Sequence, residues 1–310
     1  MSLIERTFEK ADEAFTFLED LAVENRSYIF RGHVKDSYLL QTTYTRAFTK
    51  SHESWDTDID ELLHLFRCGL ARIGVDPIDT DSRLDWMEFA RHHGVPTPCL
   101  DFSYSPYVAL FFAFSGIDRK APYSSESLYS AIYAIDVEEL AIAWAHGFSK
   151  APLKGAVEFY DKYREFLSPE ATALFEKGFP GQTLQFIPAP SRFNVRMQKQ
   201  QGALLYDTLR YPLLGLENLD ELLKRWDEPQ IYPSRVQDEP NTLCYKIRLN
   251  QKIAKPVFQR LELMGITGGS LYQDADGVAL DVINAYFYNP RSSYLRDIRF
   301  PPHDDSDMPF

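Results

Sequence analysis

The chain has 310 residues, of which 45% are hydrophobic and 25% are charged, and it contains 22 Phe and 18 Tyr. This composition is typical of a folded globular protein and excludes intrinsic disorder as the main state. The formal net charge of −12 opposes broad, sequence-independent binding to nucleic acid. The three cysteines, Cys68, Cys99 and Cys244, form no CxxC pair, so we expect neither a disulfide framework nor a structural zinc site.

The N-terminal segment alternates apolar and charged residues at helical spacing and contains no apolar core of a signal peptide. We therefore expect a helical lead-in at residues 1–25, ahead of the main domain. The most apolar uninterrupted run, residues 108–114, is far shorter than the ~18 residues needed to cross a bilayer. The sequence thus predicts no membrane association and favours the cytoplasm, where thiols stay reduced.

Two elements are predicted in the first part of the main domain. An apolar run at residues 28–32 contains the triplet Phe30-Arg31-Gly32 and predicts a strand that carries Arg31 to its C-terminal end. Residues 56–73 place apolar side chains at 3.6-residue spacing before Gly74, which predicts an amphipathic helix.

The next elements are predicted from capping and breaking residues. A helix is expected to end near residues 94–96, because a proline disfavours a helical residue before it. Ser105 and Pro106 predict the N-cap and the first position of a buried apolar helix that reaches residue 113.

The later part of the chain mixes strands and helices without a strict βαβ rhythm. We therefore predict an α+β fold whose mixed or split β-sheet core is surrounded by helices. The expected elements are strands at 130–136, 203–206 and 244–249, a helix at 137–146, a helical insertion at about 147–190 with its best helix at 165–177, a turn at 274–277 and a frayed tail at 291–310. The main domain would then span residues 26–290.

No motif for a metal or a phosphate loop is present. His92 and His93 are adjacent, and neighbouring helical residues point about 100° apart, unlike the i, i+4 histidines of an HExxH helix. The sequence also lacks GxxxxGK[ST] and GxGxxG. We predict no metal site.

Three segments, taken together, resemble the FRG domain family. They are Phe30-Arg31-Gly32, the run 86–113 that contains His-His-Gly-Val-Pro-Thr and Leu-Asp-Phe-Ser-Tyr-Ser-Pro, and the run 194–202 with Asn-Val-Arg and Gln-Gln-Gly. The resemblance covers roughly residues 20–285. Pro98 departs from it, because the family usually has a basic residue there.

The resemblance implies a bacterial or phage-associated protein found beside defence or toxin systems. The order of its motifs is similar to the split layout of ADP-ribosyltransferases, which implies an ADP-ribosyltransferase-like fold and a toxin or anti-phage effector that acts on NAD by ADP-ribosyl transfer or NAD hydrolysis. NAD would then be a substrate, with no covalently bound cofactor and with a protein or nucleic-acid acceptor left open. The alternative is a noncatalytic module of a defence system that senses a nucleotide or a protein.

The same resemblance implies the site residues. Arg31 would anchor a pyrophosphate, His92 or His93 would orient the substrate, and Asp101 or Gln200 would act on the ribose. The residues expected to be catalytic are Arg31, His92, Asp101 and Gln200, and those expected to bind substrate are Gly32, Arg46, His93, Thr97, Ser103, Ser105, Arg196 and Gln201. We predict that Arg31, Asp101 and Gln200 converge on one cleft.

Each of these roles has a structural alternative. Arg31 would simply pair with Asp101, Ser105 would only cap a helix, and Arg196 and Gln200 would brace the turn before Gly202. Gln200 also stands where an ADP-ribosyltransferase has a glutamate. An amide there stabilises a ligand by hydrogen bonds and not by charge.

Overall fold

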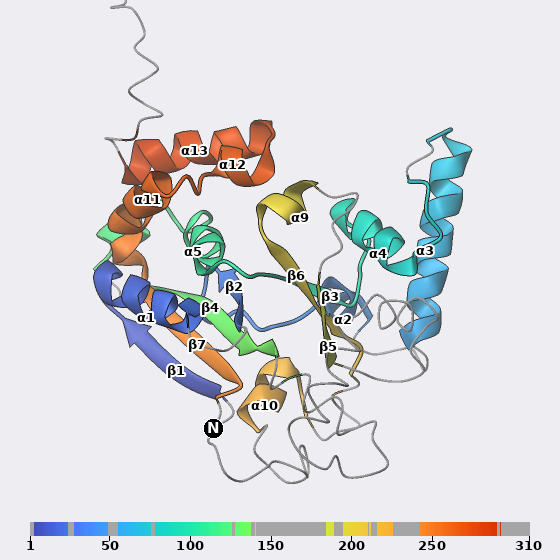
Figure 1. Ribbon diagram of the computed structural model, residues 1–310, viewed down its shortest axis with the longest axis horizontal. Coiled ribbons are helices and arrows are strands. Elements are labelled where there is room, and N and C mark those ends of the chain that lie inside the picture. The colour runs from blue at the N-terminus through green and yellow to red at the C-terminus, as the bar shows by residue number, and fades with distance from the viewer. Residues whose placement is uncertain are drawn as a thin grey trace, which may run out of the picture.

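The computed structural model describes residues 3–23, 28–48, 55–75, 78–125, 128–137, 140, 184–188, 195–209, 211, 216–225, 242–289 and 292. Within these ranges the chain forms one seven-stranded sheet in the order β1-β7-β4-β2-β3-β6-β5, with helices packed around it (Figure 1). The strands are β1 (Leu3–Phe8), β2 (Tyr28–His33), β3 (Cys99–Ser103), β4 (Tyr129–Asp136), β5 (Leu184–Pro188), β6 (Gly202–Asp207) and β7 (Cys244–Asn250). The β1–β7 pair is parallel and the other pairs are antiparallel, so the predicted α+β fold with a mixed sheet is confirmed.

The described helices lie between successive strands in the sequence and after the last strand, β7. They are α1 (Ala11–Val23), α2 (Thr43–Phe48), α3 (Trp55–Arg72), α4 (Arg83–His92), α5 (Pro106–Phe114), α9 (Val195–Lys199), α10 (Leu219–Lys224), α11 (Ala254–Leu263), α12 (Gly268–Tyr272) and α13 (Ala275–Tyr288), with short 3₁₀ turns η1 (Ala121–Tyr123) and η3 (Gln251–Ile253). The predicted cap is confirmed, because the Ser105 side chain accepts a hydrogen bond from the backbone N–H of Val108. Among the described residues, no helix is long and apolar enough to cross a membrane.

Three sequence predictions need correction. Residues 3–8 form a strand rather than the start of a helix, because they pair with β7 from the other end of the chain and that pairing outweighs their local spacing. Residues 184–188 form a strand within the stretch predicted to be helical. Asp274 does not open a turn, since its side chain accepts from the N–H of Gly277 and caps α13.

Other predictions lie mostly or wholly outside the described residues. They concern the helices at 137–146 and 165–177, the remainder of the insertion at 147–190, and the tail at 291–310.

The hydrophobic core has three parts, which cover both faces of the sheet. One part packs α1, α5 and α11 against β2, β4 and β7. A second packs α10 against the opposite face. A third lies between α3, α4 and the strands β3 and β6. Helices α3 and α4 thus stand on one side of the molecule and α11–α13 on the other (Figure 1).

The sheet is nearly split between β2 and β3. These strands pair at a single position, Phe30 with Ser103, whereas β2 pairs with β4 over six positions. Beyond that point this edge of β3 has no neighbouring strand in the part of the chain that the structure describes, so its backbone groups need other partners. This gap is where the candidate site lies.

Candidate functional site

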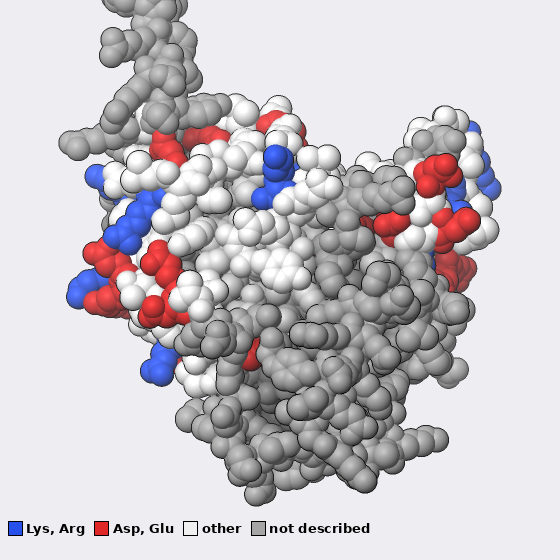
Figure 2. All heavy atoms as spheres, in the orientation of Figure 1, with Lys and Arg blue, Asp and Glu red and all other residues white. Residues whose placement is uncertain are grey.

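A cavity of about 470 Å³ opens beside the β2–β3 junction. Its volume falls in the usual range for small-molecule sites. Its walls come from the ends of β2 and β3, the C-terminal half of α4, one face of α5, the short helix α9 and the end of α12. Three arginines and two carboxylates line it. On the face in Figure 2, the acidic side chains that are drawn lie mainly over α1, α13 and α3.

Arg31 is held by neutral acceptors. Its Nη1 donates to the backbone carbonyl of Asp101 at 2.6 Å, and its Nε donates to His33 Nε2 at 3.0 Å. The Nη2 hydrogens and the second Nη1 hydrogen have no acceptor among the described residues, and Arg31 forms no ion pair with a described carboxylate. Burial lowers the pKa of Arg31 to about 10, the charge of Asp101 opposes this shift, and Arg91 and Arg46 add to it.

Asp101 is the ion-pair partner of Arg91, not of Arg31. The Arg91 Nε donates to Asp101 Oδ1 at 2.8 Å, and its Nη2 contacts the other carboxylate oxygen. Burial raises the pKa of Asp101, but the charge and hydrogen bond of Arg91, helped by Arg31, outweigh it and hold that pKa below its usual value. The carboxylate is therefore ionised at neutral pH. The direct Arg31–Asp101 ion pair of the structural alternative is not seen among the described residues: Arg31 donates to the backbone carbonyl of Asp101, and the carboxylate pairs with Arg91.

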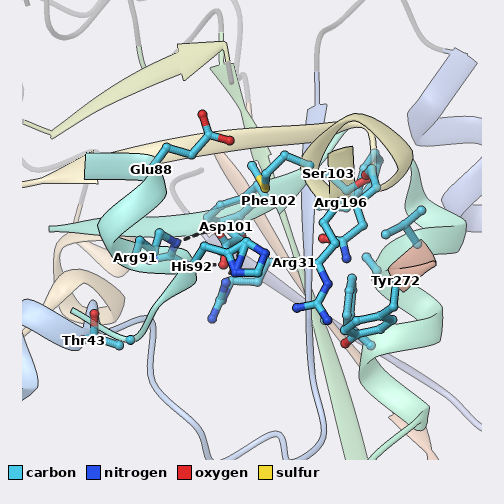
Figure 3. A pocket seen from close by; sticks show the side chains of 18 of the residues that line it. Arg31, Thr43, Glu88, Arg91, His92, Asp101, Phe102, Ser103, Arg196 and Tyr272 are labelled. Carbon is cyan, nitrogen blue, oxygen red and sulfur yellow. Dashed lines mark hydrogen bonds and ion pairs between the residues drawn. The ribbon is translucent and has the colours of Figure 1, made fainter. Parts of the chain in front are cut away.

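The opposite wall joins α9 to the α12–α13 hairpin. Arg196 pairs with Asp274 and lies over the Tyr272 ring, with its guanidinium carbon 4.5 Å from the ring centroid. Tyr272 meets Phe112 of α5 edge-on, with ring centroids 6.1 Å apart. Gln200 donates from Nε2 to the carbonyl of Leu271 at 3.4 Å. Figure 3 shows Arg31, Arg91, His92 and Asp101 grouped on one side of the cavity, with Arg196 and Tyr272 on the other.

The four residues predicted to be catalytic all line this cavity. Arg31, Asp101 and Gln200 come from β2, β3 and the residue after α9, so the three converge as expected. His92 lies at the end of α4, where burial and then the charges of His93 and Arg196 lower its pKa. Their chemical roles stay predictions.

The predicted binding residues divide into two groups. Gly32, Ser103 and Arg196 line the cavity, while Arg46, His93, Thr97, Ser105 and Gln201 do not. His93 packs on Phe89, with ring centroids 4.6 Å apart. Thr97 is fully buried, and Gln201 has a left-handed backbone with φ 48°. Ser103 donates to the backbone carbonyl of Gln200 and so ties α9 to β3.

Sequence reasoning missed two of the residues that shape the site. Arg91 directly precedes the His-His-Gly motif, and this position could have marked it as a candidate site residue. Its ion pair with Asp101, however, depends on how α4 packs on β3. His33 follows the Phe-Arg-Gly triplet, and the alternation of a strand places it on the same face as Arg31. That alternation could have indicated the contact.

The burial of His33 predicts how stability depends on pH. His33 is 7% exposed, and burial followed by the charges of Arg31 and Lys246 lowers its pKa to about 3, against the hydrogen bond with the Tyr38 carbonyl. Between about pH 3 and about pH 6.5 the unfolded chain binds a proton at His33 that the folded protein does not bind. The contribution of the buried neutral His33 to folding stability is therefore complete above about pH 6.5 and is lost as the pH falls toward 3. We expect the free energy of unfolding to fall by about 1.4 kcal/mol per pH unit in that window through this residue.

Urea unfolding of the wild type and of His33→Phe at several pH values between 4 and 7.5 measures this effect. The difference in stability between the two proteins should shrink as the pH falls. A difference that does not change with pH would contradict the assignment of a neutral His33.

The fold and the cavity define an α+β protein with an arginine-lined cleft at a split in its sheet. Residues 26–121 match the model of the FRG domain, so the chain contains an FRG domain that supplies β2, β3, α4 and α5 of the cleft. The match ends before α9 and α12, and the predicted extension of this domain to residue 290 stays a prediction. No curated protein and no solved structure matches the chain.

Proposed function

We propose that the cleft binds a pyrophosphate-containing nucleotide of the NAD and ADP-ribose class. The observation that carries the proposal is Arg31, a partly buried guanidinium that lines the cavity with neutral partners and unused N–H donors among the described residues. An anion would compensate this charge, and the planar fork of arginine matches phosphate oxygens. The volume of about 470 Å³ suits a ligand of this size.

The two sides of the cavity differ in a way that also supports a nucleotide. On one side Arg31 carries a positive charge without an ion-pair partner among the described residues, because Asp101 pairs with Arg91, whereas Phe112 and Tyr272 on the other side offer aromatic surface. A ligand with a charged centre and a flat ring would use both sides. Arg196, which covers the Tyr272 ring, can contact both parts of such a ligand.

A second candidate function is cleavage of NAD, through ADP-ribosyl transfer or hydrolysis. It is favoured by the Asp101 carboxylate, which is ionised and 45% exposed in the same cavity as His92. A carboxylate can stabilise an oxocarbenium-like transition state by its charge. Gln200 does not take this part in our proposal, since it donates to the Leu271 carbonyl. With cleavage, the protein would act as a toxin or anti-phage effector, and without cleavage as a sensor.

Incubation with NAD and with ADP-ribose tests both candidates. We expect ligand at a hundredfold excess over its Kd to raise stability by about 2.7 kcal/mol, seen as a higher melting temperature. Nicotinamide release, followed by chromatography, would add the enzymatic function to binding. If saturating NAD produces no thermal shift and no nicotinamide release, the proposal is contradicted.

A further inference from the structure

A chain of hydrogen bonds reaches from the far side of β2 to the cleft. The carbonyl of Tyr38 faces His33 Nδ1 at 3.2 Å, and His33 Nε2 faces Arg31 Nε at 3.0 Å. Because Arg31 Nε can only donate and the carbonyl can only accept, the imidazole must carry its proton on Nδ1 and present a lone pair at Nε2. Both contacts thus fix one neutral tautomer.

The surroundings of His33 leave little freedom for another arrangement. The ring meets Tyr133 of β4 edge-on, with centroids 5.3 Å apart, and Tyr38 at 6.4 Å. The charged groups near it are Arg31 and Lys246, both cationic, and no described carboxylate pairs with it. A positive charge on this ring would be repelled by Arg31 of β2 and by Lys246 of β7. His33 therefore remains an acceptor over the pH range in which free histidine titrates.

From this geometry we infer that His33 is a positioning residue, which orients the Arg31 guanidinium toward the anion bound in the cleft. The inference rests on the proposed function for its ligand. Two neutral acceptors, His33 Nε2 and the Asp101 carbonyl, hold the guanidinium of Arg31, which lines the cavity, and its other N–H groups have no acceptor among the described residues. A carboxylate in place of His33 would neutralise Arg31. A neutral imidazole directs it and leaves its charge for the ligand.

A double-mutant cycle separates positioning from a general structural role. ADP-ribose affinity is measured by calorimetry for the wild type, His33→Phe, Arg31→Lys and the double variant. Lysine has no Nε–H group to donate to His33. His33→Phe should therefore weaken ADP-ribose binding about tenfold in the wild-type background and cause no additional weakening in the Arg31→Lys background. His33→Gln, which restores an acceptor, should recover most of the affinity. His64→Phe on the exposed face of α3 is the matched control and should leave affinity unchanged.

Two results would overturn the inference. One is equal weakening by His33→Phe in both backgrounds, and the other is a lower melting temperature with unchanged ADP-ribose affinity. If the wild type binds neither ADP-ribose nor NAD, the proposed function fails, and the positioning is judged by NMR of the Arg31 Nε–H group. That hydrogen should exchange slowly in the wild type and rapidly in His33→Phe, and equal exchange in both proteins would contradict positioning.

Discussion

Replacement of Gly32 by alanine is expected to lower the free energy of unfolding by about 3 kcal/mol or more. A Cβ atom at Gly32 would stand 2.0 Å from the carbonyl oxygen of Ala109 and 2.7 Å from the nitrogen of Ala113. Both atoms belong to the backbone of α5 and cannot turn aside. The helix must therefore move away from β2, which would open the core around Phe30.

Gly69→Ala is the matched control for this prediction. Gly69 lies on the exposed face of α3, and no atom stands within 4 Å of a Cβ added there. Alanine at such a helical position should raise stability by about 0.5–1 kcal/mol. Chemical unfolding of both variants measures the contrast. An equal stability of Gly32→Ala and wild type would show that α5 does not pack this closely on β2.

The three residues of the Phe-Arg-Gly triplet have different structural roles. Phe30 is 1% exposed and belongs to the core, Arg31 faces the cleft, and Gly32 admits α5. The glycine was expected to bind substrate, but its lack of a side chain is explained by helix packing. The triplet thus combines one core residue, one cavity-lining residue and one residue that allows close helix packing.

Arg31→Lys is expected to weaken ADP-ribose binding by about 1–3 kcal/mol, which is roughly fivefold to more than a hundredfold. Lysine keeps the positive charge but loses the planar fork and the Nε–H group that His33 accepts. The melting temperature should change little, since the carboxylate of Asp101 keeps its partner Arg91. The affinity is measured by calorimetry at one fixed salt concentration, because salt screens this interaction.

Arg248→Lys provides the control. Arg248 donates from Nε to Asp36 at 2.8 Å and does not line the cavity, so its replacement should leave ADP-ribose affinity unchanged. Unchanged affinity in Arg31→Lys as well would remove Arg31 from ligand binding. A large drop in melting temperature for Arg31→Lys, without an effect on binding, would instead favour a purely structural role.

Local patterns in the sequence predicted the elements that depend on near neighbours. The 3.6-residue spacing before Gly74 predicted α3, and the Ser105–Pro106 pair predicted the start of α5. The apolar run around Phe30 predicted β2 and placed Arg31 near its C-terminal end. These features are decided within a few residues of chain, by side-chain periodicity and by capping hydrogen bonds, so one sequence suffices for them.

The contacts that define the site needed the tertiary structure. Residues 3–8 became a strand because β7, more than two hundred positions away, offered them an edge. Asp101 paired with Arg91 and not with Arg31 because α4 packs over β3, while β2 touches β3 at one position and leaves a gap for the Arg31 guanidinium. Which strands are neighbours and where they diverge depends on packing across the whole chain, and the charge left on Arg31 follows from that packing alone.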